Sequence, residues 1–154
     1  IIMATKLQTV FDAFLAKMSE DDWTGWSEEE VARDLVEILN GAIPYFKFPK
    51  KSLEFKVSFD KYDNFIDGEF DEDLNNHEIQ ILATYMKVEW LNRTILTWEN
   101  VKPLYYEKDF SQANLIDKFK QLLEREEKKA LRLESIYYRS TDRKPFDYGR
   151  LAEN

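Results

Sequence analysis

An acidic stretch, residues 60–73, carries the side chains with the most obvious potential for chemistry. Its carboxylates suggest a calcium-binding loop, which needs oxygen ligands at loop positions 1, 3 and 5, glycine at position 6 and glutamate at position 12. A loop that begins at Asp63 puts Gly68 at the glycine position, but Phe65 and Leu74 fall where ligands are required. We therefore interpret the stretch as a solvated turn that could hold an incidental cation, and we expect no metal site and no cofactor.

The sequence contains no recognisable catalytic constellation. The only histidine, His77, lies at a predicted helix start, and without a cysteine or a second histidine it cannot form a Cys/His couple or a His-based metal site. Asp71, Glu72 and Asp73 could form an acid/base set, but consecutive carboxylates before a helix more often interact with its dipole. The four glycines are isolated, so no phosphate-binding loop is present. We expect a protein that is not an enzyme.

Size and composition favour a single soluble domain. The chain has 154 residues, 44% of them hydrophobic, which suffices for one core. It contains no cysteine, which excludes disulfides and fits synthesis in a reducing cytoplasm. No apolar run approaches the ~20 residues needed to cross a bilayer, so we expect no membrane partner.

Charge is distributed unevenly along the chain. Residues 1–77 contain 8 Lys/Arg and 17 Asp/Glu, whereas residues 78–154 contain the remaining 14 Lys/Arg and 13 Asp/Glu. Because phosphate binding depends on Lys and Arg, the acidic first half argues against a conventional nucleic-acid-binding face there. An acidic surface past which DNA slides without specific binding remains compatible with this pattern.

Hydrophobic periodicity predicts four helices, at about residues 5–19, 27–43, 75–94 and 111–138. The third is apolar around most of its circumference, which is typical of a helix surrounded by other protein. We predict a mainly α fold: a four-helix bundle over residues 1–140, followed by an extended C-terminal tail at residues 141–154.

Residues 52–59 follow a different period. Leu53, Phe55, Val57 and Phe59 alternate with polar residues, as in a half-buried strand. Turn-forming residues follow this stretch. We predict a β-hairpin or projecting loop at about residues 50–70, inserted between the second and third helices and reaching toward a neighbouring subunit or another component.

The fourth helix carries a heptad-like stripe. Ile116, Leu123, Ala130 and Tyr137 are spaced by sevens, and Glu126 interrupts the pattern. The stripe could pack on the chain's own core. Because little chain is left to cover its far end, we predict a subunit interface there, formed by Ala130, Leu133, Ile136 and Tyr137.

The C-terminal tail combines basic residues with anchors suited to a partner's groove. These residues are Arg139, Arg143, Phe146, Tyr148, Arg150 and Leu151. We predict that the tail docks on a partner protein; the alternative is that it is disordered, as termini often are.

Two runs in the second half of the chain resemble a known family. Residues 73–91 follow the pattern acidic-Leu-x-x-x-Glu-Ile-x-Ile-Leu-Ala-x-x-Met-x-x-Glu-Trp-Leu, and Lys108-Asp109-Phe110-Ser111-x-Ala113-Asn114-Leu115 leads into a charged helix ending in Tyr137-Tyr138-Arg139. Over residues 70–140 the chain resembles neck proteins, the head–tail connector adaptors of tailed bacteriophages that infect Gram-positive bacteria.

The resemblance implies a virion structural protein made in the host bacterial cytoplasm. It implies a ring of typically about twelve copies, with DNA passing through the centre without specific binding. The ring would lie between the portal protein, which the C-terminal tail would bind, and a tail or second neck protein. The main alternative is an intracellular regulatory or interaction protein whose long amphipathic helix binds a partner. A nucleic-acid-binding module is a third reading, which the charge disfavours.

Overall fold

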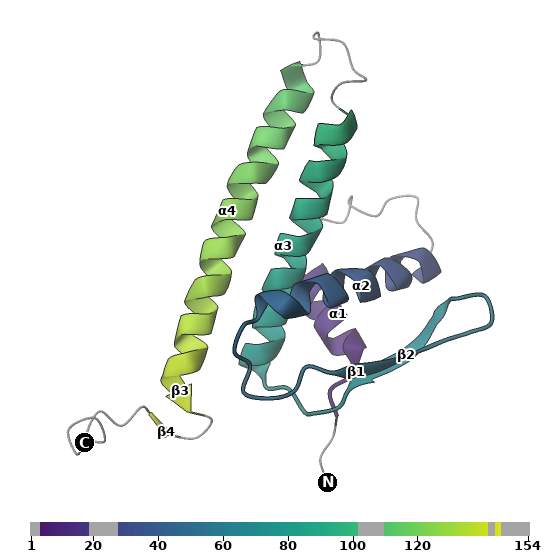
Figure 1. The fold of residues 1–154 in the computed structure, drawn as a ribbon, viewed down its shortest axis with the longest axis vertical. Helices are drawn as coiled ribbons and strands as arrows, with labels where there is room; N and C mark the ends of the chain where they lie inside the picture. Colours follow the sequence, from purple (N-terminus) through teal and green to yellow (C-terminus); the bar gives the residue numbers. More distant parts are fainter. Residues whose placement is uncertain (1–3, 19–27, 102–109, 142–143, 146–154) are drawn as a thin grey trace.

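The computed structural model describes residues 4–18, 28–101, 110–141 and 144–145 (Figure 1). The fold is mainly α with a small antiparallel hairpin, as predicted. The elements are α1 (Leu7–Leu15), α2 (Glu28–Ala42), a short 3-10 helix η2 (Ile43–Tyr45), β1 (Phe55–Phe59), β2 (Phe65–Phe70), α3 (Asn76–Val101), α4 (Phe110–Arg139), β3 (Ser140–Thr141) and β4 (Lys144–Pro145).

Helix α3 is the centre of the fold. It contacts α1, α2 and α4, and the run from Ile81 to Met86 is buried at every position. Six consecutive buried residues cover more than one complete helical turn. The prediction that this helix is apolar around most of its circumference and enclosed by protein is therefore confirmed.

The arrangement of the helices differs from the predicted four-helix bundle. Helix α4 runs alongside α3 over most of its length, whereas α1 and α2 cross the N-terminal half of α3 (Figure 1). Helix α1 is only nine residues long, so it cannot accompany the 26 residues of α3. In the second half of α3, Arg93 still pairs with Asp34 and Glu37 of α2, whereas Glu99 near the end of the helix pairs with Lys120 of α4.

The start of α3 is capped by Asn75 and Glu78. The Glu78 backbone N–H donates to Asn75 Oδ1 at 2.9 Å, and the Asn75 backbone N–H donates to Glu78 Oε1 at 2.9 Å. This reciprocal pair satisfies two donors that the helix itself cannot use.

The end of α3 lies at Val101, beyond the predicted end near residue 94. Lys120 of α4 forms a 2.9 Å ion pair with Glu99, and the Thr97 hydroxyl donates to the Arg93 carbonyl at 2.8 Å. The helix thus continues for about two turns that periodicity alone does not indicate, and Lys120 of α4 pairs with it there. Residues 102–109, between α3 and α4, lie outside the described residues.

Strands β1 and β2 form the predicted hairpin. Phe55 pairs with Phe70 and Ser58 with Asp67, and the register shifts by one residue between Ser58 and Phe59. The tip is a tight turn, with Asp63 at φ 61°, a conformation that aspartate tolerates better than most residues. The hairpin projects past the helices at its turn end (Figure 1).

The N-terminal segment and α1 attach the hairpin to the helices. The Phe70 N–H donates to the Thr5 carbonyl at 2.7 Å, so the segment before α1 pairs with the outer edge of β2. Gly68 is required where Leu7 packs on the strand, because a Cβ there would lie 2.6 Å from Leu7 Cδ1. The base of the hairpin is therefore fixed, and its turn end extends away.

Candidate interaction surfaces

A buried polar cluster joins the end of α4 to the start of α3. The Tyr137 hydroxyl donates to Glu78 Oε2 at 2.8 Å and accepts the Lys50 backbone N–H at 2.7 Å. Glu78 is completely buried and is neutralised by Lys51, whose Nζ lies 3.2 Å from Glu78 Oε1. The Tyr137 ring packs edge-on against Phe46. Sequence reasoning missed this cluster, because its members come from three distant segments.

This cluster corrects the predicted subunit interface on α4. Tyr137 and Ala130 are buried in the core of the chain itself, and Leu133 packs against that core. Residues 46–50, which follow η2, provide the cover that the sequence appeared to lack. Among the four predicted interface residues, only Ile136 is exposed, at 45%.

The other residues of the heptad stripe also pack against the chain itself. Ile116 is buried, and Leu123 packs against the core. Glu126, which interrupts the stripe, is buried with its Oε1 3.2 Å from Lys87 Nζ of α3. The apolar face of α4 is therefore occupied by α3 and is not available to a partner.

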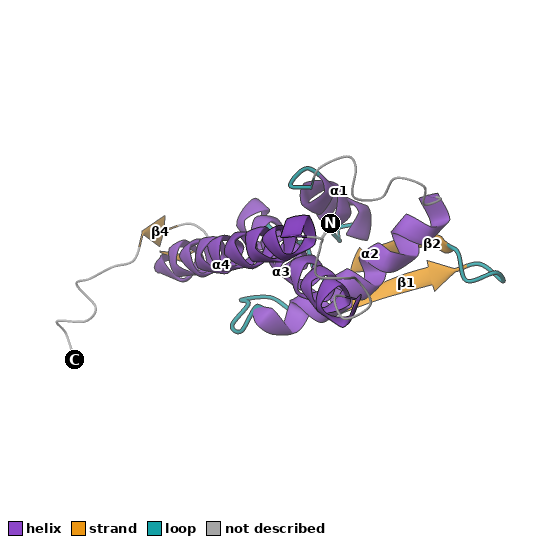
Figure 2. Ribbon diagram, turned by 90° about the horizontal axis from the view of Figure 1, so that it is seen from above, coloured by secondary structure: helices purple, strands orange, loops and turns teal. Residues whose placement is uncertain are grey.

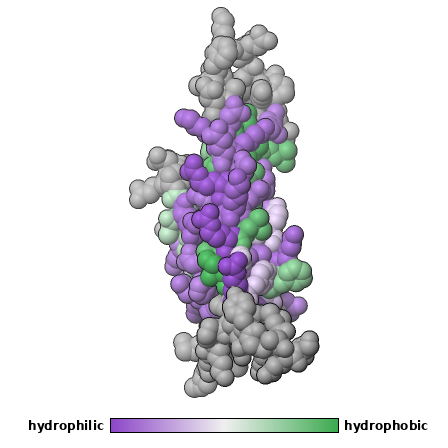
Figure 3. All heavy atoms as spheres, turned by 90° about the vertical axis from the view of Figure 1, so that its left-hand side faces the viewer, coloured by the Kyte–Doolittle hydropathy of each residue, from purple (hydrophilic) through white to green (hydrophobic). Residues whose placement is uncertain are grey.

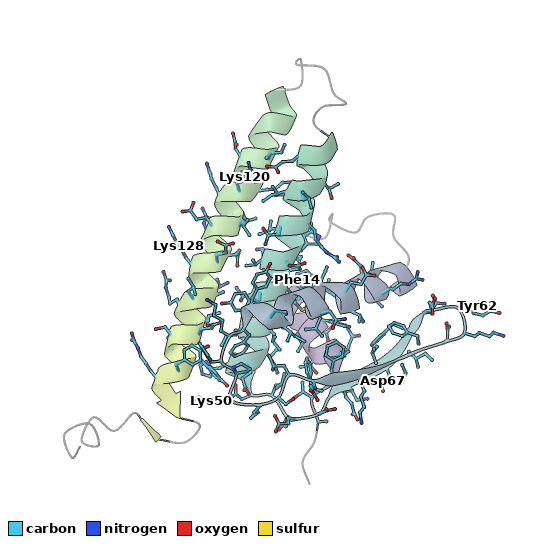
Figure 4. All side chains as sticks on the ribbon, viewed as in Figure 1. Phe14, Lys50, Tyr62, Asp67, Lys120 and Lys128 are labelled. Carbon is cyan, nitrogen blue, oxygen red and sulfur yellow. The ribbon has the colours of Figure 1, made fainter. Side chains whose placement is uncertain are left out.

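The outward face of α4 is mainly hydrophilic, with isolated apolar residues (Figure 3). Lys128 extends from it (Figure 4) and pairs with Glu124 of the same helix, whereas Leu131 is 60% exposed. Ile136, five residues further along α4, is also exposed. The two apolar side chains are too scattered to form an extended contact by themselves.

A second surface lies beside the end of α4, and we call it the aromatic patch: Tyr45, Phe48 and Tyr138. Phe48 is 71% exposed, and its ring lies 6.3 Å from that of Tyr138. Tyr45 stacks on Tyr85. Burial, followed by the neighbouring Glu134 carboxylate, raises the pKa of Tyr138 above its ordinary value. Exposed aromatic side chains of this kind are common at protein contacts.

The hairpin tip is the third surface. Phe59, Tyr62 and Ile66 are exposed there, and Tyr62 extends away from the body of the protein (Figure 4). Asp60 accepts the backbone N–H groups of Tyr62 and Asn64 at 2.8 and 2.9 Å. The Asn64 hydrogen bond is the main cause that lowers the pKa of the Asp60 carboxyl. The turn is therefore ordered by its own hydrogen bonds.

The predicted β-segment residues differ in burial along the strand. Leu53 is buried, Phe55 and Val57 are half-buried and packed against the core, and Phe59 is exposed. The alternation predicted from the sequence is present, but the apolar side chains become more exposed toward the hairpin tip, where they no longer contact the core. An open groove of about 700 Å³ borders the start of β1, between it and the segment after α2.

The predicted docking tail is described only at its start. Arg139 is exposed at the end of α4, and the chain then reverses, with Thr141 of β3 pairing with Lys144 of β4. Arg143, Phe146, Tyr148, Arg150 and Leu151 lie outside the described residues.

The described residues contain neither a group of three His, Cys, Asp or Glu side chains that could hold a metal ion nor a helix apolar enough to cross a membrane. His77 is exposed in the first turn of α3, as predicted. The acidic stretch forms the hairpin turn and β2 instead of a ligand loop.

Comparison with known proteins gives no match: no family model, no curated protein and no solved structure is significantly similar to this chain.

Proposed function

We propose that the protein is a structural adaptor that joins other components of an assembly through its projecting hairpin, its aromatic patch and its C-terminal tail. The observation that carries this proposal is the hairpin. Its base is fixed to α1, whereas its tip presents Phe59, Tyr62 and Ile66 to solvent. Exposed apolar side chains on a rigid projection are typical of a contact with another protein.

The specific assembly in this proposal is the neck of a tailed bacteriophage. It rests on the resemblance of residues 70–140 to neck adaptors. About twelve copies would form a ring, with the hairpin tip contacting a neighbouring subunit or a tail component. The C-terminal tail, with Arg139 at its start, would bind the portal protein. DNA would pass through the ring without specific binding.

The alternative of a regulatory protein with a partner-binding amphipathic helix gains no specific support. The stripe that such a partner would cover includes Ile116, Ala130 and Tyr137, and these residues are buried against the chain's own core. A partner could use that stripe only by displacing α3, at the expense of the Lys87–Glu126 pair and the Tyr137–Glu78 hydrogen bond.

The proposal is tested by making the hairpin tip polar. In a phage that encodes this chain, the triple variant Phe59→Ser, Tyr62→Ser and Ile66→Ser should fold with unchanged helical circular dichroism. It should fail to complement head–tail joining. The matched control is Leu96→Ser, which removes a side chain of similar exposure at the far end of α3. Normal joining by the triple variant would contradict the proposed role of the hairpin.

A further inference from the structure

The outer edge of β1 is an open strand edge. Strand β2 lies on the side of the hairpin toward α1, and β1 lies on the other side (Figure 2). The outer edge of β2 is covered by Thr5 and Lys6. Among the described residues, no backbone group pairs with the outer edge of β1. An open edge of this kind accepts another extended strand.

The backbone hydrogen bonds show which groups point outward. The Asp71 N–H donates to the Glu54 carbonyl, and the Asp60 N–H donates to the Asn64 carbonyl. Along an antiparallel strand, the backbone N–H and C=O of successive residues point alternately toward one neighbour and toward the other. The even-numbered residues of β1 therefore direct their N–H and C=O toward β2. Phe55, Val57 and Phe59 therefore direct theirs outward, and they form the row of groups open to a further strand.

The sequence of β1, Phe-Lys-Val-Ser-Phe, is complementary to itself in the antiparallel direction. In a pairing centred on Val57, each Phe55 opposes Phe59 of the other strand, and each Lys56 opposes Ser58. Aromatic residues then face each other, and no like charges meet. One step further, Glu54 would oppose Asp60, so the pairing ends with the five residues of the strand.

We propose that in the free protein the β1 edge binds a second copy of this chain, strand to strand, about a two-fold axis through Val57. The two hairpins would form one four-stranded antiparallel sheet. The groove of about 700 Å³ beside Leu53 and Phe55 leaves room for the end of the incoming strand. The pairing covers Phe59, which is 41% exposed in the single chain. This inference does not depend on the proposed neck function.

Two substitutions at Ser58 test the pairing, one expected to weaken dimerisation and the other to strengthen it. Within one chain Ser58 opposes Asp67, whereas across the two-fold it would oppose Lys56. Ser58→Lys should therefore leave the hairpin folded but place lysines opposite each other twice. We expect it to weaken dimerisation about tenfold. Ser58→Glu should strengthen it, because each glutamate would oppose a lysine across the two-fold; the same glutamate also opposes Asp67 within its own hairpin, so circular dichroism must first show that this variant is folded.

Sedimentation velocity over a concentration series measures these effects, with circular dichroism as the check on folding. The wild-type chain should show a reversible dimer, weakened by Ser58→Lys and strengthened by Ser58→Glu. A wild-type chain that stays monomeric at every concentration would overturn the inference, and this is the result expected if the edge receives a strand from a different protein. Equal dimerisation by both variants would overturn it as well.

A single introduced cysteine tests the register independently. The chain has no cysteine of its own. Val57 is the only residue that meets its own counterpart, at a Cα separation of about 5.5 Å, within the range of a disulfide. Val57→Cys should form a covalent dimer under mild oxidation, and Tyr62→Cys at the hairpin tip should not. Equal cross-linking by both, or none by Val57→Cys, would contradict the proposed register.

Discussion

At the scale of single residues, Tyr137 connects three parts of the chain. Its hydroxyl lies between Glu78 of α3 and the backbone of Lys50, and the Lys50 ammonium lies 4.6 Å from its ring centroid. Glu78 is buried completely, so Lys51 and this hydroxyl take the place of water around its carboxylate. A buried carboxylate that loses a donor is costly, because water cannot replace the bond.

Tyr137→Phe should therefore destabilise the protein by about 1–3 kcal/mol, although it removes only one oxygen atom. The measurement is the free energy of unfolding in urea. Tyr62→Phe is the control, because Tyr62 is 70% exposed, and it should change stability by less than about 0.5 kcal/mol. Equal effects of the two substitutions would show that the Tyr137 hydroxyl does not support the fold.

Tyr85 makes the free energy of unfolding depend on pH in the alkaline range. Burial, followed by the neighbouring Glu134 carboxylate, raises the pKa of Tyr85 well above its ordinary value of 10.0. The folded state thus holds the phenolic proton more tightly than the unfolded state does. Its contribution is complete below pH 10.0 and is lost progressively as the pH rises above that value.

The free energy of unfolding should therefore fall as the pH passes 10.0, and it should fall less steeply in Tyr85→Phe. Urea unfolding at pH values on both sides of 10.0 measures the two slopes. The same slope in both proteins would show that Tyr85 ionises equally in the folded and unfolded states.

Local residue patterns were predictable where the partners are close in sequence. The capping pair Asn75 and Glu78 is three residues apart, and its reciprocal bonds are present. The Glu78–Tyr137 bond was not predictable, because 59 residues separate its members. No periodicity within one helix indicates which distant side chain will satisfy a buried carboxylate.

At the scale of elements, α4 is held to α3 by polar pairs as well as by its apolar stripe. Lys87 and Glu126 form an ion pair with side chains only 15% and 8% exposed. In the sequence, Glu126 only interrupts the heptad pattern. Its ion pair was not predictable, because its partner Lys87 lies on another helix. The burial of Tyr137 was not predictable from the pattern of α4 either, because the segment that covers it follows η2.

Lys87→Met should cost about 3–5 kcal/mol, since it leaves Glu126 charged, buried and without its partner. The double variant Lys87→Met, Glu126→Leu should recover most of this loss. Lys128→Met is the control, because Lys128 and its partner Glu124 are both largely exposed, and it should change stability by less than about 1 kcal/mol. A double variant as unstable as Lys87→Met would show that the charge is not the cause.

At the scale of the whole molecule, packing is concentrated around the N-terminal half of α3. Beyond Arg93, which pairs with Asp34 and Glu37 of α2, α3 continues beside α4 (Figure 1), with the exposed Leu96 and the exposed Glu99–Lys120 pair near the far end. Helix periodicity predicted which faces are buried. It did not predict the oblique crossing of α1 and α2, because many crossing angles can bury the same apolar face.

Amide hydrogen exchange should therefore be faster in residues 96–101 and 110–116 than in residues 81–91, although all three segments are helical. Exchange followed by mass spectrometry on the intact chain gives this comparison. Uniform protection along α3 would mean that the far half is stabilised by contacts other than those with α4.

The central claim, that this chain is an adaptor in a phage neck, is tested most directly by its amount in purified virions. Quantitative mass spectrometry of virions from a phage encoding it should find about twelve copies of the chain per virion, as a closed ring of the kind implied by the resemblance requires. Absence of the chain from intact virions would contradict the account.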